Sequence, residues 1–134
     1  MPSTASKIHA MAIGRRKTSS ASVRIVSGDG SVTVNNLPAD QYFPGIAAKA
    51  RYQAPFKAID VNKYSAVVRV VGGGRIGQLD ATVLGISRAL VEIKDTFKPQ
   101  LRTAGLMTRN PRQRQRRMIG TGGKSRRQKQ SPKR

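Results

Sequence analysis

The last 26 residues of the chain, 109–134, carry 11 lysine or arginine residues and no acidic residue. Met118 and Ile119 are the only large apolar side chains in this segment. A stretch with so little to bury cannot form a core, so we expect it to stay disordered until it meets a partner. The folded domain should therefore lie within residues 1–108, and residues 109–134 should form an extended basic tail.

The chain as a whole is also strongly basic. Its 134 residues include 26 lysines and arginines against six acidic residues, which gives a net charge of +20. A compact protein with this excess repels itself unless it lies against a polyanion, so nucleic acid is the first candidate partner and a membrane surface the second. Arginine outnumbers lysine by eight to three in the tail. Because the planar guanidinium forks onto phosphate, this composition favours nucleic acid.

The chain has little to offer as a metal site or a catalytic centre. It has no cysteine and one histidine, His9. Disulfides, cysteine-ligated zinc and cysteine nucleophiles are therefore excluded. His9 lies between two apolar residues, which is typical of a strand or surface position. Six acidic residues leave little for acid–base chemistry, and we read Asp60, Asp80, Glu92 and Asp95 as helix caps and surface partners.

Alternation of apolar and polar residues indicates about four strands. Residues 8–14 form a short apolar stretch suited to an edge strand. Residues 21–25 and 32–34 alternate on either side of the turn sequence Ser27-Gly28-Asp29-Gly30, which predicts a β-hairpin. Residues 64–71 give the strongest strand pattern of the chain.

Two stretches predict the main helices. Residues 39–53 have mostly helical spacing, and Pro44 and Pro55 should divide this region into two short pieces. Leu79, Val83, Ile86, Leu90 and Ile93 form one apolar stripe and predict the clearest helix. Residues 101–107 predict a last short helical piece. The sum is an α+β fold with two main helices packed on one face of the sheet.

The segment VVGGGRIGQLDA raises the question of a dinucleotide cofactor, because Gly72, Gly74 and Gly77 match G-x-G-x-x-G between a strand and a helix. A dinucleotide fold also needs a second parallel strand after that helix. The sequence KDTFKPQLRTAG that follows predicts none, so we expect no cofactor. The glycines instead suit a tight turn, an anion site at the helix N-terminus beside Arg75, or both; the expected anion is an RNA phosphate.

Several motifs occur in the order typical of one known family. They are GRRKTSSASVRIVSGDGSVTVNN, YFP, PFKAID, VVRVVGGGRIGQLDATVLGISRAL, GLMTRNPRQRQRR and a terminal Pro-Lys-Arg. From about residue 8 onward the chain resembles the ninth protein of the small ribosomal subunit, in its bacterial or organellar form. The resemblance implies a four-stranded mixed sheet backed by two helices. It implies a structural protein of the ribosome in the bacterial cytoplasm, or in an organelle matrix or stroma.

The resemblance also implies partners and contact residues. The partners are small-subunit ribosomal RNA, peptidyl-site transfer RNA and neighbouring proteins of the subunit head, with no membrane and no small-molecule substrate. Lys133 and Arg134 would contact the transfer RNA. The residues expected to bind ribosomal RNA are Arg15, Arg16, Lys17, Gly72, Gly73, Gly74, Arg75, Gly77, Gln78, Arg109, Arg112, Arg114, Arg116, Arg117, Lys124, Arg126, Arg127 and Lys129.

The C-terminus departs from the family's usual ending of an aromatic residue followed by Ser-Lys-Arg. Here Gln130-Ser131-Pro132 precede the two terminal cations. Pro132 biases Ser131 toward extended backbone, which suits a threaded tail. Two other hypotheses remain open from the residues: a free-standing basic protein that coats nucleic acid without preference, and a nucleotide-dependent enzyme.

Overall fold

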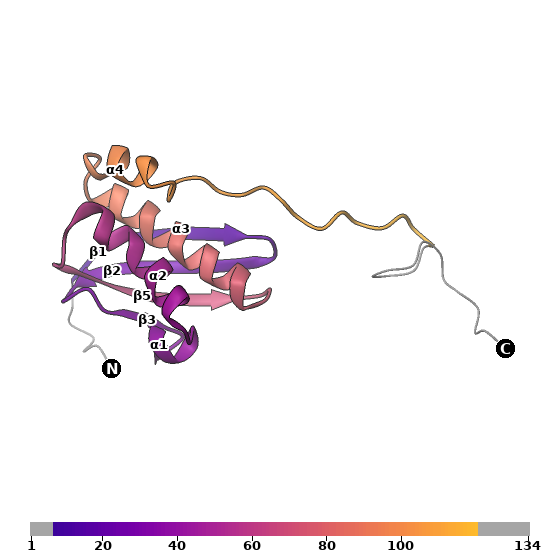
Figure 1. Cartoon of the computed structure of the whole chain (residues 1–134), viewed down its shortest axis with the longest axis horizontal. Helices are drawn as coiled ribbons and strands as arrows, with labels where there is room; N and C mark the ends of the chain where they lie inside the picture. The colour runs from indigo at the N-terminus through magenta and orange to yellow at the C-terminus, as the bar shows by residue number, and fades with distance from the viewer. Residues whose placement is uncertain (1–6, 121–134) are drawn as a thin grey trace.

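The computed structural model describes residues 7–120 and has a five-stranded sheet with helices on one of its faces (Figure 1). The α+β class is confirmed. The elements in chain order are β1 (Ile8–Arg16), β2 (Ser19–Ser27), β3 (Val32–Val34), β4 (Leu37–Pro38), α1 (Ala39–Tyr42), α2 (Ile46–Ile59), β5 (Tyr64–Val71), α3 (Arg75–Ile93) and α4 (Phe97–Thr103).

The sheet is mixed, with the strand order β1-β2-β5-β3-β4. β1 and β5 flank β2 in antiparallel pairing, whereas β3 runs parallel to β5 and antiparallel to β4. The expected count of four strands was too low by one. The additional strand, β4, has two residues after the Asn35-Asn36 turn, which is too short to show any alternation.

The expected hairpin between residues 21–25 and 32–34 is wrong. The two segments are antiparallel strands, but β5 lies between them. The turn sequence does not close on itself: the amide of Gly28 donates to the carbonyl of Lys63, and the amide of Asp29 donates to Ser65 Oγ. β5 is largely apolar and takes a strand on each side, which the local turn signal could not reveal. The actual hairpin joins β1 to β2 at residues 17–18.

The expectation that each proline interrupts a helix is confirmed at Pro44 and wrong at Pro55. Pro44 lies between α1 and α2, as expected, but Pro55 lies inside α2 and is fully buried. The tertiary packing of its ring outweighs the hydrogen bond that α2 loses there. The last helix, α4, also begins and ends earlier than the expected 101–107. Gly105, with φ of 75°, terminates it, and the Leu106 amide bonds back to the Leu101 carbonyl.

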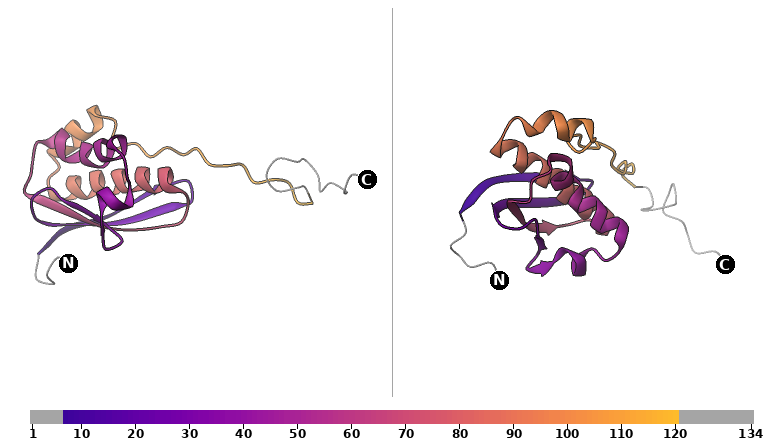
Figure 2. Two further views of the ribbon diagram at one scale, coloured as in Figure 1. Left: turned by 60° about the horizontal axis from the view of Figure 1, so that its bottom comes forward. Right: turned by 60° about the vertical axis from the view of Figure 1, so that its left-hand side comes forward.

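α3 lies directly on the sheet, and α2 and α4 pack against α3 on the same side (Figure 2). The predicted apolar stripe of α3 faces the core, with Ile86 and Leu90 fully buried. A glycine pair brings its backbone close to β1. A Cβ on Gly14 would collide with the carbonyl oxygen of Ala81, and one on Gly85 would lie 2.6 Å from Val23 Cγ2. Within the described residues, no helix covers the opposite face of the sheet (Figure 2).

Replacement of Gly85 by alanine should destabilise the domain by about 1–3 kcal/mol, because the added methyl group overpacks the contact between α3 and the sheet. Urea denaturation of the purified protein measures this change. Gly74→Ala is the matched control, since a Cβ there would meet nothing within 4 Å; its cost should stay below about 1 kcal/mol. Equal stability of the two variants would contradict the close contact.

Candidate nucleic-acid interface

Two basic segments that are distant in sequence meet at one end of the sheet (Figure 1). The β1–β2 hairpin brings Lys17 beside the loop that joins β5 to α3 and beside Arg75, the first residue of α3. The two segments enclose a hollow of about 350 Å³. Its lining residues are Lys17, Thr18, Ser19, Gly73, Gly74, Arg75, Ile76 and Gly77. The basic residues of the hairpin and the residues of the glycine loop, which two separate motifs had indicated, therefore share one surface.

At two positions of this loop the fold itself requires a glycine. Gly72 and Gly73 have φ values of 76° and 65°, a region that side chains disfavour. A Cβ on Gly72 would lie 2.6 Å from the carbonyl oxygen of Thr18, and one on Gly73 would collide with Ser19 Oγ. The loop thus lies against the hairpin backbone. Gly74 differs, because its φ is −100° and a Cβ would enter open space.

The N-terminus of α3 opens onto the same hollow. Its first intrahelical hydrogen bond runs from the Gln78 amide to the Gly74 carbonyl at 2.9 Å. The amides of Arg75, Ile76 and Gly77 therefore have no acceptor within the helix. Together with the partial positive charge of the helix terminus, these amides favour an anion at this position.

Gln78 stabilises the loop from inside. Its side-chain nitrogen donates to the Gly72 carbonyl at 3.0 Å, and its side-chain oxygen accepts from Tyr42 at 2.8 Å. Ser19 Oγ donates to the same Gly72 carbonyl at 3.0 Å. Asn35 extends the network with a 3.3 Å hydrogen bond to the Tyr42 hydroxyl. The side-chain amide of Gln78 thus connects the glycine loop to α1, a role that the sequence motif did not indicate.

Arg16 holds the beginning of the tail. Its Nε lies 3.6 Å from Asp80 Oδ2 on α3, and its Nη1 donates to the Arg112 carbonyl at 2.7 Å. The side chains of Arg16 and Asp80 are only 14% and 23% exposed. Asp80 Oδ1 forms a second ion pair with Arg51 of α2. The carboxylate therefore ties together β1, α2, α3 and the tail.

A second hollow of about 300 Å³ lies where the tail leaves the domain. Arg15, Arg51 and Arg109 contribute to its wall, together with Asp80 and Asn110. The exposed guanidinium of Arg15 and the half-buried one of Arg109 belong to residues that the sequence had indicated. Arg51 was missed, because a lone arginine on an exposed helical turn carries no sequence signal.

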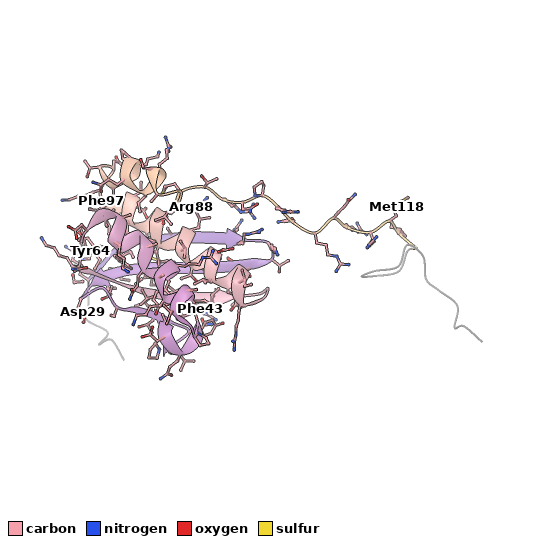
Figure 3. All side chains as sticks on the ribbon, in the orientation of Figure 1. Asp29, Phe43, Tyr64, Arg88, Phe97 and Met118 are labelled. Carbon is pink, nitrogen blue, oxygen red and sulfur yellow. The ribbon has the colours of Figure 1, made fainter. Side chains whose placement is uncertain are left out.

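Residues 108–118 lie outside any helix or strand and lead away from the domain, so that Met118 is far from the sheet (Figure 3). Arg112, Arg114, Arg116 and Arg117 are exposed along this segment. The remaining predicted contacts fall beyond the described residues. They are Lys124, Arg126, Arg127, Lys129, Lys133 and Arg134.

Among residues 7–120, Asp29 and Tyr52 have shifted pKa values, and both lie away from this interface. A hydrogen bond from Ser31 lowers the pKa of the exposed Asp29 carboxyl. Burial, followed by a hydrogen bond to Asp40, raises the pKa of the Tyr52 hydroxyl. Tyr52 therefore remains a donor that connects α2 to α1 at neutral pH.

Within residues 7–120, no three histidine or acidic side chains gather in a way that could hold a metal ion. In the same range, no helix is long and apolar enough to cross a membrane. The described chain after α3 contains α4 and no further strand. The glycine loop is therefore followed by a helix that does not lead into a second parallel strand, unlike a dinucleotide-binding unit.

Replacement of Asp80 by asparagine should destabilise the domain by about 1–3 kcal/mol, because the half-buried Arg16 loses its anionic partner. Urea denaturation measures the stability. Trypsin should also cleave faster after Arg109 and Arg112, since the beginning of the tail is no longer held. Asp95→Asn removes an exposed acidic residue outside this cluster and should stay within about 0.5 kcal/mol of the unchanged protein. Unchanged cleavage in the Asp80 variant would refute the anchoring role.

Comparison with known proteins shows the family of the chain. The profile of the family described as ribosomal protein S9/S16 matches residues 14–134. A relative from Gloeothece citriformis (strain PCC 7424), the small ribosomal subunit protein uS9, is 43% identical over 109 residues. The match covers 80% of this chain and 80% of the relative. The chain therefore belongs to the ribosomal protein S9/S16 family, whose members are structural proteins of the ribosome.

Proposed function

We propose that this chain, a structural constituent of the small ribosomal subunit, binds ribosomal RNA through the end of the domain where the hairpin, the glycine loop and the tail meet. The observation that carries the proposal is the distribution of paired and exposed cations. Arg16 and Arg51 are engaged with Asp80, whereas Lys17 and Arg75 are exposed beside the free amides of α3.

The chemistry of this end suits a phosphate. Backbone amides at a helix N-terminus donate hydrogen bonds toward an anion, and adjacent lysine and arginine side chains add charge. Gly74 supports this interpretation, because nothing in the fold requires a glycine there. Without a side chain, the backbone at Gly74 allows an RNA strand to approach the amides closely.

The tail extends the same interaction. Its exposed arginines present guanidinium groups along an extended backbone, and this arrangement suits phosphates on both sides of a narrow RNA channel. If the chain neutralises about 6–10 phosphates, its affinity should fall by roughly 10³–10⁵ between 50 and 200 mM salt. The tail has no aromatic residue, so it holds the RNA backbone rather than stacking on bases.

We further propose that the tip of the tail contacts transfer RNA in the peptidyl site. The family resemblance supports this role for Lys133 and Arg134, which keep the two terminal charges of the family pattern. They act as cations against phosphate and perform no bond chemistry. Residues 109–134 then have two parts: an anchor in ribosomal RNA and a tip at the transfer RNA.

Sucrose-gradient sedimentation of a gentle lysate tests the ribosomal placement. The protein should migrate with whole ribosomes in magnesium and with small subunits after EDTA removes the magnesium. Migration at the top of the gradient, or with nuclease-sensitive DNA, would instead favour a free-standing nucleic-acid-coating protein.

Two deletions test the division of the tail. Removal of residues 132–134 should leave incorporation into small subunits nearly unchanged but weaken retention of transfer RNA in the peptidyl site, because only the tip charges are lost. Removal of residues 109–134 should weaken incorporation as well. Quantitative sedimentation and filter binding of labelled transfer RNA measure the two effects. Failure of assembly after the short deletion would contradict the separation of anchor and tip.

A further inference from the structure

The face of the sheet opposite the helices carries cations that the interface described above does not use. On β2, Ser22 and Arg24 are exposed, and on β5 Arg69 and Val71 are exposed. These residues alternate with the buried ones, which places them on the face away from the helices. All six acidic residues of the chain lie in helices or turns and none in a strand. The uncovered face is therefore basic without local compensation.

Arg24 and Arg69 are close neighbours on this face. Arg24 lies opposite Val67 and Arg69 lies opposite Ser22, so the two arginines form a diagonal pair across adjacent strands. Residues in this relation are separated by about 7–8 Å between their Cα atoms. Neither arginine takes part in an ion pair within residues 7–120. Like charges at this spacing repel each other, and the fold itself gains nothing from them.

A hollow of about 760 Å³ lies over the same strands. It forms where β3 ends at Val34 while β5 continues to Val71. Asn35 bonds to the backbone of Val70 in place of further strand pairing, with its side chain donating to the carbonyl and accepting from the amide. Ser22, Asn36 and the two arginines are among the lining residues. The hollow thus combines hydroxyl, amide and guanidinium groups with the valines of β5.

We infer that this open face, centred on Arg24 and Arg69, is a second RNA-backbone site, separate from the loop and the tail. The inference rests on the proposed function, because it assigns a further surface to the same RNA. Guanidinium groups fork onto phosphate, and serine and asparagine side chains bond to phosphate or sugar oxygens. Tyr64 is the only phenylalanine, tyrosine or tryptophan in any strand. The face therefore binds the RNA backbone by its shape and charge and does not stack on bases.

The competing occupant is a neighbouring protein. Met11, Ile13 and Val71 are 50%, 48% and 57% exposed, and they would suit an apolar partner. The guanidinium pair favours RNA, because an apolar partner would leave both cations without an anion. The experiments below separate the two occupants.

The first experiment measures the salt dependence of binding to a transcript of the small-subunit ribosomal RNA. Arg24→Gln combined with Arg69→Gln should reduce the slope of log affinity against log salt by about two, or about one for each lost phosphate contact. Arg24→Lys with Arg69→Lys should restore most of the slope. Lys98→Gln with Arg102→Gln, on the exposed surface of α4, removes the same charge and should leave the slope unchanged. A wild-type slope in the first variant, or an equal loss in the control, would overturn the inference.

The second experiment identifies the occupant in assembled subunits. A benzoylphenylalanine at position 22 places a photocrosslinker in the middle of the face. A nuclease-sensitive adduct to ribosomal RNA supports the inference, whereas an adduct to a protein, or no adduct, overturns it.

A comparison with Lys17→Gln separates this inference from the proposed function. If the unchanged protein does not bind the transcript, the proposed function itself fails. If Lys17→Gln lowers the slope but the Arg24 and Arg69 variant does not, only the second site fails.

Discussion

The close contact between α3 and the sheet is the constraint on which the remaining structure depends. Gly14 on β1 and Gly85 on α3 lack side chains at a point where the two backbones approach closely. This contact sets the height of the helix above the sheet, and the buried stripe around Ile86 and Leu90 sets its rotation. The N-terminus of α3 is thereby placed beside the β1–β2 hairpin. The packing of α3 therefore also fixes the position of the amides at its N-terminus, because the end of a helix cannot move independently of its buried face.

Asp80 connects this packing to the candidate interface. Because α3 is fixed, its carboxylate reaches Arg16 on β1 and Arg51 on α2, and Arg16 in turn holds the Arg112 carbonyl. One half-buried anion thus pairs with two of the cations and, through Arg16, orients the beginning of the tail. Lys17, Arg75, Arg24 and Arg69 remain exposed and outside the ion pairs that the described residues form. A strongly basic chain therefore uses some cations to hold itself together and leaves the others exposed on its surface.

Local patterns predicted the elements well where one face is buried. The alternation over residues 64–71 matches β5, and the stripe from Leu79 to Ile93 lies within α3. Pairing was less predictable, because alternation identifies a strand without naming its neighbour, and β5 came between two segments that resembled a hairpin. Pro55 likewise followed tertiary packing rather than the local rule. For the candidate site, the motifs indicated Lys17, the glycine loop and Arg75. They did not indicate Arg51, Asn35 or Tyr42, whose roles come only from contacts.

The sequence by itself determined that residues 109–134 are strongly basic with few apolar side chains and that the partner would be a polyanion, because composition alone sets net charge and apolar content. The ordered motifs also determined the family. Only the tertiary structure decided which charged and polar groups are engaged internally. Arg16, Asp80 and Arg112 meet across as many as 96 positions of sequence, and Gln78 turns inward to Gly72 and Tyr42. Ion pairs and hydrogen bonds depend on distances of a few ångströms, which a sequence pattern does not specify until the helix and the sheet are packed.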